Sequence, residues 1–241
     1  MFVSYSGHQL LTDLRQFCDG LFLIEDLRSE RKSDNTLVTK VDREISDFFK
    51  RHPATQAFTF YSEEDFSSLV FPALILDPID GTRELVAGRA ECAVSACYMP
   101  TPHLKDAASL IFNPFTGFGM SSDDTPVWTS APVTHRPLGM VSRSEWESGL
   151  YSEAGAFDLV PRGSIAYKLA LLAAGCIDFV VTKKPKNIWD IAAGTHLCWQ
   201  RGIQLWSQGE VVTRFDMAAI EGPLLWCRPE LATSLRGSFS I

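Results

Sequence analysis

The segment Asp77-Pro78-Ile79-Asp80-Gly81-Thr82 directly follows the apolar run 71–76. We expect that run to form a strand ending at Asp77, because Pro78 has no amide proton for a ladder hydrogen bond. Gly81 and Thr82 can then open a helix, whose free backbone amides attract an anion. Carboxylates beside such an anion site suit Mg²⁺ and a phosphate ester, although an ordinary acidic turn explains these six residues equally well.

The spacing of the two aspartates argues against one class of phosphatase. Haloacid-dehalogenase-type enzymes place their aspartates two positions apart, in the pattern Asp-x-Asp-Gly-Thr, whereas Asp77 and Asp80 are three positions apart. In a regular strand the extra residue turns the second carboxylate away from the face that carries the first. The segment therefore does not fit that class.

Four other motifs accompany this segment. They are the run Lys-Ser-Asp-Asn-Thr-Leu-Val-Thr-Lys-Val-Asp at 32–42, the pair Glu63-Glu64, the pair Gly163-Ser164, and Trp-Asp-Ile-Ala-Ala-Gly at 189–194. In content and order, the five motifs resemble those of the inositol monophosphatase superfamily of magnesium-dependent, lithium-sensitive phosphatases. The resemblance runs from about Lys32 to the C-terminus. It implies a layered αβαβα sandwich of mixed α+β and α/β character.

The resemblance also implies a metal site of two or three Mg²⁺ ions, with Li⁺ as an inhibitor. Without cations its carboxylates would repel one another, so metal or protons must neutralise them. Judged by itself, Asp190 at a predicted helix start is more simply an N-cap, and Glu64 a solvent-facing neighbour. The family's ligands correspond to the carboxylates of Glu63, Asp77, Asp80 and Asp190 and to the backbone carbonyl of Ile79.

The implied chemistry is direct hydrolysis by a metal-activated water, without a covalent phosphoenzyme. By the resemblance, Thr82 contacts the attacking water and Asp42 orients Thr82, although a surface helix position explains Asp42 on its residue type alone. The amides of Gly81 and Thr82 are expected to hold the phosphate, with Ser164 as a further donor.

Three local features concern the substrate. The runs Arg83-Glu84-Leu85, Ser142-Arg143-Ser144 and Asn187-Ile188-Trp189-Asp190 are similar to those of the 3'(2'),5'-bisphosphate nucleotidase (CysQ-like) group, although Glu145 stands where that group has histidine. Inositol enzymes carry an acidic residue seven positions before the aspartate of the Trp-Asp pair, and Lys183 occupies that position here. A lysine cannot accept hydrogen bonds from ring hydroxyls, but it suits a second phosphate.

We therefore expect adenosine 3',5'-bisphosphate to be hydrolysed to AMP and phosphate, with Arg83 and Lys183 contacting it. One alternative is a phosphatase for inositol 1-phosphate or a sugar (bis)phosphate. Another is a non-catalytic protein that binds a phosphorylated metabolite. Each basic residue could equally be an exposed charge on a solvated loop.

Composition agrees with a compact enzyme for a small metabolite. The chain has 241 residues, 46% of them hydrophobic, which suffices for one unit or two packed halves. A net charge of −7 argues against a nucleic acid polymer as partner. No apolar stretch reaches the roughly 18 residues of a membrane span, so a cytoplasmic location is expected. The family resemblance leaves a monomer and a homodimer open.

The periodicity of apolar residues predicts the elements. We expect a boundary between halves within 121–137, dividing an N-terminal α+β half with a largely antiparallel sheet (1–130) from a C-terminal α/β half that supplies Asp190 (131–241). Ser164 should cap a helix whose apolar stripe ends at Cys176, and all six cysteines should be mostly buried, reduced thiols. Helices are expected at 8–28 and 40–51, and strands at 57–61, 73–76, 92–99, 107–113 and 179–182.

Overall fold

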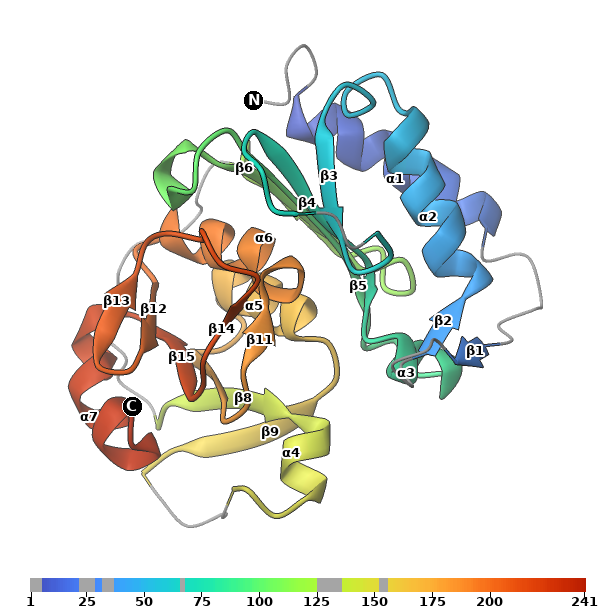
Figure 1. The fold of residues 1–241 in the computed structure, drawn as a ribbon. Helices are drawn as coiled ribbons and strands as arrows, with labels where there is room; N and C mark the ends of the chain where they lie inside the picture. Colours follow the sequence, from blue (N-terminus) through green and yellow to red (C-terminus); the bar gives the residue numbers. More distant parts are fainter. Residues whose placement is uncertain (1–5, 22–28, 32–36, 66–67, 125–135, 152–155) are drawn as a thin grey trace.

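Helices and sheets alternate in five layers in the computed structural model of this protein (Figure 1). The structure describes residues 6–21, 29–31, 37–65, 68–124, 136–151 and 156–241. Helices α1 (Gly7–Leu21) and α2 (Lys40–Arg51) cover the outer face of the first sheet. Helices α5 (Ile165–Ala174) and α6 (Ile188–Trp199) lie between the sheets, and α7 (Pro229–Phe239) packs outside the second. The predicted αβαβα sandwich is therefore confirmed.

The first sheet has five strands in the order β3-β4-β5-β6-β7. Only β3 and β4 pair in parallel, so the sheet is largely antiparallel, as predicted. Cys92, just before β5, packs with the outer helices, whereas Cys97 packs toward the central ones, so the two thiols lie on opposite faces of the sheet. The strands are β3 (Thr59–Ser62), β4 (Ala73–Asp80), β5 (Ala93–Met99), β6 (Ala108–Phe112) and β7 (Gly119–Ser121).

The second sheet has six strands in the order β13-β12-β15-β10-β8-β9. β8 pairs in parallel with both β9 and β10, and the remaining pairs are antiparallel. The strand predicted at 179–182 is confirmed at both ends as β10. The strands are β8 (Leu138–Ser142), β9 (Asp158–Arg162), β10 (Phe179–Thr182), β12 (Gln204–Ser207), β13 (Glu210–Val212) and β15 (Leu224–Cys227).

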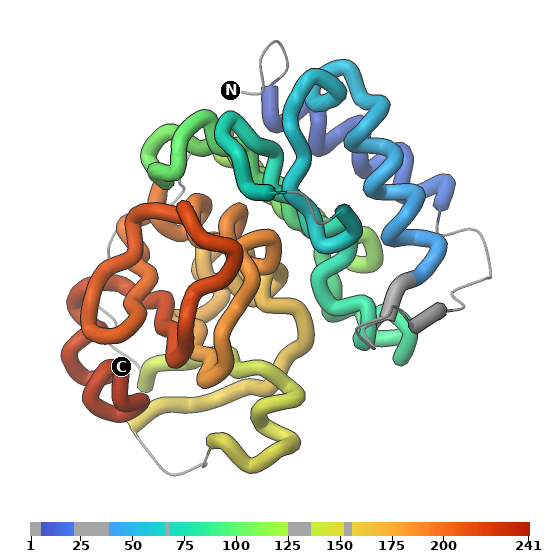
Figure 2. Tube along the Cα trace, in the orientation of Figure 1, coloured from blue at the N-terminus to red at the C-terminus, as the bar shows by residue number. Residues whose placement is uncertain are grey.

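Short elements complete the fold. They are β1 (Ser29–Arg31), β2 (Leu37–Thr39), α3 (Thr82–Val86), η1 (Leu104–Asp106), α4 (Arg143–Glu147), β11 (Lys186–Asn187) and β14 (Ala219–Ile220). Most of the predicted boundary region, 125–135, lies outside the described residues, as does the motif part 32–36. We call 6–124 and 136–241 the N-terminal and C-terminal halves; Figure 2 traces the first from blue to green and the second from yellow to red.

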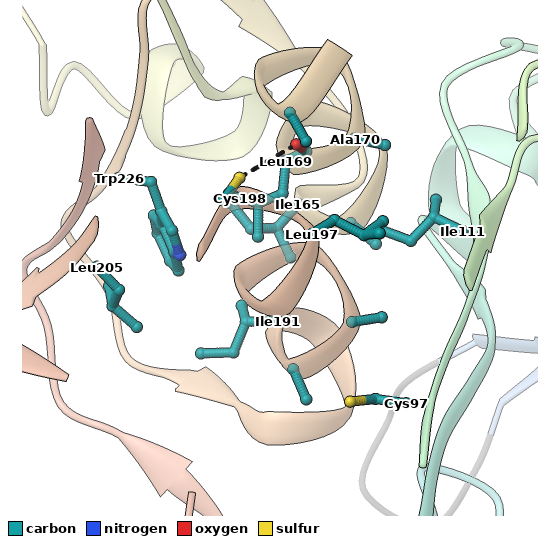
Figure 3. Packing of buried hydrophobic residues seen from close by; sticks show 14 of the residues in the cluster. Cys97, Ile111, Ile165, Leu169, Ala170, Ile191, Leu197, Cys198, Leu205 and Trp226 are labelled. Atoms are coloured by element: carbon teal, nitrogen blue, oxygen red, sulfur yellow. Dashed lines mark hydrogen bonds between the residues drawn. The ribbon is translucent and has the colours of Figure 1, made fainter. Parts of the chain in front are cut away.

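The two central helices carry the largest apolar cluster (Figure 3). They approach closely at Gly194 of α6, where a Cβ would lie 2.5 Å from the Cβ of Leu169 on α5. The Cys198 thiol donates to the Leu169 carbonyl at 3.4 Å. In the described part of the chain, no helix is both long and apolar enough to cross a membrane.

The prediction for Cys176 is wrong. Helix α5 ends before Gly175, which has a φ of 80°, and Cys176 beyond it is exposed rather than part of the apolar stripe. The other five cysteines are buried free thiols, as predicted.

Candidate metal and phosphate site

A bulge in β4 brings two aspartates together. Asp77 pairs with Ser95 of β5 and Asp80 with Ala93, so three steps along β4 oppose two steps along β5. The extra residue in a bulge re-aims the side chains that follow it. β4 thus continues to Asp80 instead of ending at Asp77, and the spacing that would separate two carboxylates in a regular strand lets them converge.

Asp190 joins them from the C-terminal half. Ligand oxygens of Asp77, Asp80 and Asp190 lie within 4.8 Å of one another. The preceding Trp189 packs on Tyr61 of β3, with ring centroids 5.4 Å apart, and its carbonyl accepts a 3.1 Å hydrogen bond from Ser95. These contacts fix the first turn of α6 against the first sheet.

Asp190 is not the N-cap of α6. The N-cap is Asn187, whose side chain makes no capping hydrogen bond, and Asp190 is the third helical residue. The Asn187 backbone amide instead hydrogen-bonds the Asp190 carboxylate. The simpler N-cap interpretation is therefore wrong, and the carboxylate faces the other two aspartates.

The cluster is electrostatically unbalanced. Asp77 is 1% exposed, and its Oδ1 has no hydrogen-bond partner. Burial, followed by the charges of Glu63, Asp80, Asp190 and Asp42, raises the pKa of Asp77 well above its usual value. Burial and then Asp80 raise the pKa of Asp190 in the same way. Convergent carboxylates with an unsatisfied buried oxygen fit a Mg²⁺ site.

Two other predicted ligands lie beside this cluster. Glu63 follows β3, and its amide donates to the Leu76 carbonyl at 3.3 Å. Its charge has the largest effect of any carboxylate on the pKa of Asp77, although it is not one of the three that converge within 4.8 Å. The Ile79 carbonyl oxygen lies in the bulge, 3.0 Å from the Thr82 hydroxyl.

Asp42 lies in the same site, and the surface interpretation of it is wrong. Its side chain is fully buried at the third position of α2. Oδ2 accepts from the Thr39 amide at 2.8 Å, and the Asp42 amide donates to the Thr39 hydroxyl oxygen at 3.4 Å, so the two residues form a capping box. The Thr39 hydroxyl also donates to Oδ2 at 2.5 Å. Oδ1 faces the Thr82 hydroxyl at 3.1 Å. Burial raises the pKa of Asp42, and the Thr39 hydrogen bonds partly offset that rise.

Gly81 and Ser164 face each other across the cleft. Gly81 has a φ of 93°, and a Cβ there would lie 3.2 Å from the Ser164 Cβ. Ser164 caps α5 by accepting from the Tyr167 amide at 2.9 Å, which confirms the predicted cap. Its hydroxyl donates to Asp80 Oδ2 at 2.7 Å, and the Ala166 amide donates to the same oxygen at 2.6 Å. Since a hydroxyl has one proton, Ser164 orients Asp80 in this structure and is not free to donate to phosphate.

The cleft between the halves holds about 590 Å³, including space open to solvent. Arg83 lies at its rim with its side chain 69% exposed, 3.9 Å from Glu147. The cleft is lined by Asp80, Gly81, Arg83 and Glu84 from the N-terminal half and by Ser142, Arg143, Ser144, Gly163, Ser164, Ile165, Lys168, Lys186 and Asp190 from the C-terminal half.

The expectation that Lys183 lies in this cleft is not met. Its Nζ donates to the Phe239 carbonyl of α7 at 2.7 Å, and Lys183 is not among the residues that line the cleft. The cause is Glu145, which accepts from the Lys183 and Lys184 amides at 3.0 Å each and so fixes the loop. The Lys183 side chain therefore packs against α7.

Two other lysines line the cleft. Lys186 lies three positions beyond Lys183, at the start of β11, and its ammonium forms no hydrogen bond or ion pair with the described residues. Lys168 is 2% exposed, and its Nζ donates to the carbonyls of Arg162 and Gly163 at 3.0 and 3.2 Å. Burial lowers the pKa of Lys168 to about 8. Sequence reasoning missed Lys168, although it is the single charge in an otherwise apolar helix.

Several residues interpreted as substrate signals form an ion-pair network. Glu84 pairs with Arg89 at 2.7 Å and lies 3.6 Å from Arg143. Arg143 also pairs with Glu91 at 2.6 Å, and Arg162 pairs with Glu91 at 2.7 Å. Glu84 and Arg143 belong to the runs that resemble the bisphosphate nucleotidase group. Their ion pairs give both residues a structural role that does not require contact with substrate.

Comparison with known proteins agrees with this architecture. A model of the inositol monophosphatase family matches residues 12–216. The uncharacterized protein y4fL of Sinorhizobium fredii is 28% identical over 191 residues, which cover 72% of this chain and 67% of y4fL.

Solved structures share the fold. The extragenic suppressor protein suhB from Bartonella henselae has a TM-score of 0.73 at 17% identity, covering 97% of this chain and 98% of suhB. CysQ from Bacteroides thetaiotaomicron, a bacterial member of the inositol monophosphatase family, has a TM-score of 0.64 at 17% identity, covering 89% and 93%. Because the family model spans most of the sequence, this chain belongs to the inositol monophosphatase family.

Proposed function

We propose that this protein is a Mg²⁺-dependent phosphomonoesterase for a small phosphorylated metabolite. The observation that carries the proposal is the convergence of Asp77, Asp80 and Asp190, with a buried oxygen of Asp77 lacking any partner. Members of the family are phosphatases. An IMPase/NADP phosphatase of this fold was solved with Mg²⁺ and phosphate, and a staphylococcal inositol monophosphatase with Li⁺ as an inhibitory complex.

The three aspartates would hold the metal, with Glu63 and the Ile79 carbonyl as neighbouring ligands. Mg²⁺ in such a site lowers the pKa of a water and stabilises charge that develops on phosphate oxygens. Ser164 and the Ala166 amide hold the Asp80 carboxylate in place, which supports a preorganised site. The Gly81 and Thr82 amides open α3 beside these carboxylates and suit the phosphate.

Proton transfer falls to Thr82 and Asp42. The Thr82 hydroxyl has one proton and lies near two acceptors, the Ile79 carbonyl and Asp42 Oδ1. If a metal engages the Ile79 carbonyl, the proton goes to Asp42, and the Thr82 oxygen can accept a hydrogen bond from an attacking water. Asp42 Oδ2 is held by Thr39, so the carboxylate cannot rotate away from Thr82 without losing those hydrogen bonds. The pair thus orients the nucleophile and can take its proton.

For the substrate we propose adenosine 3',5'-bisphosphate. Lys168 and Lys186 support this choice, because both line the cleft and the Lys186 ammonium has no partner among the described residues. Two neighbouring ammonium groups suit a second phosphate. Inositol 1-phosphate is the second candidate, because solved inositol monophosphatases share the fold, including the Thermotoga maritima protein at a TM-score of 0.72.

Phosphate release with Mg²⁺ tests the proposal. Both candidates are assayed side by side, with Asp77→Asn as the blank. Faster phosphate release from the nucleotide supports the hypothesis that Lys168 and Lys186 bind a second phosphate. Faster release from inositol 1-phosphate contradicts it. A different outcome is that the protein binds Mg²⁺ and these ligands but releases phosphate from neither of them, nor from a sugar bisphosphate. That result would favour the non-catalytic alternative.

A further inference from the structure

A buried carboxylate, Glu91, joins the two halves beneath the cleft. Glu91 precedes β5 in the N-terminal half and is 9% exposed. One Arg143 nitrogen lies 2.7 and 2.6 Å from its two oxygens, and Arg162 donates at 2.7 Å. The Gly163 backbone amide donates at 2.8 Å. All these donors belong to the C-terminal half, so this carboxylate fixes the turn before α5.

The backbone of Glu91 contacts the facing wall of the cleft. A Cβ on Gly81 would lie 2.9 Å from the Glu91 carbonyl oxygen and 3.2 Å from the Ser164 Cβ. A Cβ on Gly163 would lie 2.2 Å from Cγ of Glu84 and 3.1 Å from the Glu91 carbonyl oxygen. The turn at Gly163 and Ser164 is therefore packed directly against Glu84 and Glu91.

This support matters because Ser164 has an unfavourable backbone conformation. Its φ is 46° and its ψ is 112°, a combination that side-chain-bearing residues rarely adopt. Such a conformation is unfavourable and persists only where its surroundings enforce it. In this conformation the Ser164 hydroxyl and the Ala166 amide both reach Asp80 Oδ2, at 2.7 and 2.6 Å.

We propose that Glu91 is a positioning residue that holds the Gly163–Ser164 turn in this conformation and thereby orients the Asp80 carboxylate for Mg²⁺. The inference rests on the proposed function only in taking Asp80 as a metal ligand. Glu91 contacts neither metal nor substrate in this account. Burial alone would raise the pKa of Glu91, but hydrogen bonds from Arg143, Gly163 and Arg162 lower it to about 2, so the carboxylate is charged wherever the enzyme works.

The test measures Mg²⁺ affinity by calorimetry in the wild type, Glu91→Gln, Ser164→Ala and the double variant. Groups that hydrogen-bond a metal ligand change affinity by about 10–100-fold, so Ser164→Ala should weaken binding within that range and Glu91→Gln, which acts through Ser164, by about 10-fold. If Glu91 acts through Ser164, Glu91→Gln has little left to disturb once Ser164→Ala is present. The double variant should then bind Mg²⁺ less than twofold more weakly than Ser164→Ala alone. Thr195→Val is the matched control, because it removes a buried 2.9 Å hydrogen bond from Trp226 and does not line the cleft.

The outcomes separate the explanations. Loss of melting temperature in Thr195→Val with unchanged Mg²⁺ affinity excludes a general effect of lower stability. Unchanged affinity in Glu91→Gln, or fully additive losses in the double variant, overturns the inference. Should Glu91→Gln not fold, Arg162→Met keeps Glu91 and Arg143 and must weaken binding in the same direction. If the wild type itself does not bind Mg²⁺, the proposed function is overturned together with the inference. That outcome differs from failure of the inference alone, in which the wild type binds Mg²⁺ and Glu91→Gln binds it equally well.

Discussion

The hydroxyl oxygen of Thr82 lies 3.1 Å from Oδ1 of Asp42, although the two residues are 40 positions apart. The contact depends on the capping box of α2, which holds the other carboxylate oxygen against Thr39. A helix cap that is also expected to serve catalysis couples folding of the N-terminal half to the site.

Thr82→Ala should lower kcat by about 10²–10³-fold and leave the fold intact. General acid–base groups typically contribute about 10²–10⁴-fold, and this change removes the hydroxyl alone. Thr82→Ser keeps the hydroxyl and should retain most activity. Steady-state kinetics on the better substrate of the two candidates checks this, and equal activity in Thr82→Ala and the wild type would remove Thr82 from the mechanism.

Asp77→Asn should abolish turnover without lowering the melting temperature in a chelator. The raised pKa of Asp77 means that the metal-free fold favours a neutral group there, and an amide of similar shape supplies one. Mg²⁺ at 100 times its Kd stabilises the wild type by about 2.7 kcal/mol, or roughly 5–10 °C. Thermal melts with and without Mg²⁺ should show that rise in the wild type and little of it in Asp77→Asn. Near-normal activity in the variant would contradict the metal assignment.

The contribution of Asp77 and Asp190 to the stability of the metal-free protein should fall as pH rises above about 4. Asp77 and Asp190 have raised pKa values in the fold, so their favourable contribution is complete below the unfolded pKa of about 4 and is lost as pH rises through the folded values. Glu91 and Glu145 have lowered pKa values, so their contribution is lost only at lower pH, below about 4.3.

Thermal melts between about pH 5 and 8, in a chelator and in Mg²⁺, test whether the stability of the metal-free protein falls as pH rises. Mg²⁺ replaces the protons, so its stabilising effect should grow with pH. A metal-free stability that rises between pH 5 and 8 would show that other groups dominate. In that case the carboxylate cluster would not be the main source of electrostatic strain.

The sequence predicted local features well where local chemistry decides them. Helix α2 was placed at 40–51, and the Thr39 and Asp42 hydrogen bonds explain why its start is so sharp. The apolar run at 179–182 predicts a buried strand, and β10 is buried at all four positions.

Tertiary features escaped prediction. The β4 bulge depends on pairing with β5, so the two-residue period alone gave the wrong relation between Asp77 and Asp80. The direction of Lys183 depends on Glu145, which hydrogen-bonds the Lys183 amide from another element. Counting positions from the Trp-Asp pair locates a segment near the site. It does not predict which lysine of that segment lines the cleft.

Lys186→Met and Lys183→Met should therefore differ, although the two residues share a loop. Removing the cleft cation Lys186 should lower kcat/KM for adenosine 3',5'-bisphosphate by about 10-fold, as expected for a lost contact of about 1.4 kcal/mol, and should leave inositol 1-phosphate within twofold. Lys183→Met loses the hydrogen bond to the Phe239 carbonyl and the contact with the Phe239 ring, both outside the cleft, so its kinetics should match the wild type.

Lys184→Met is the control for net charge, because Lys184 is exposed on the same loop and does not line the cleft. Side-by-side kcat/KM values for the three variants on both substrates decide the matter. A loss in Lys183→Met that equals the loss in Lys186→Met would mean that the loop turns its lysines toward substrate in solution. Equal losses on both substrates in Lys186→Met would place that ammonium at the reacting phosphate, which is the one group that both substrates share.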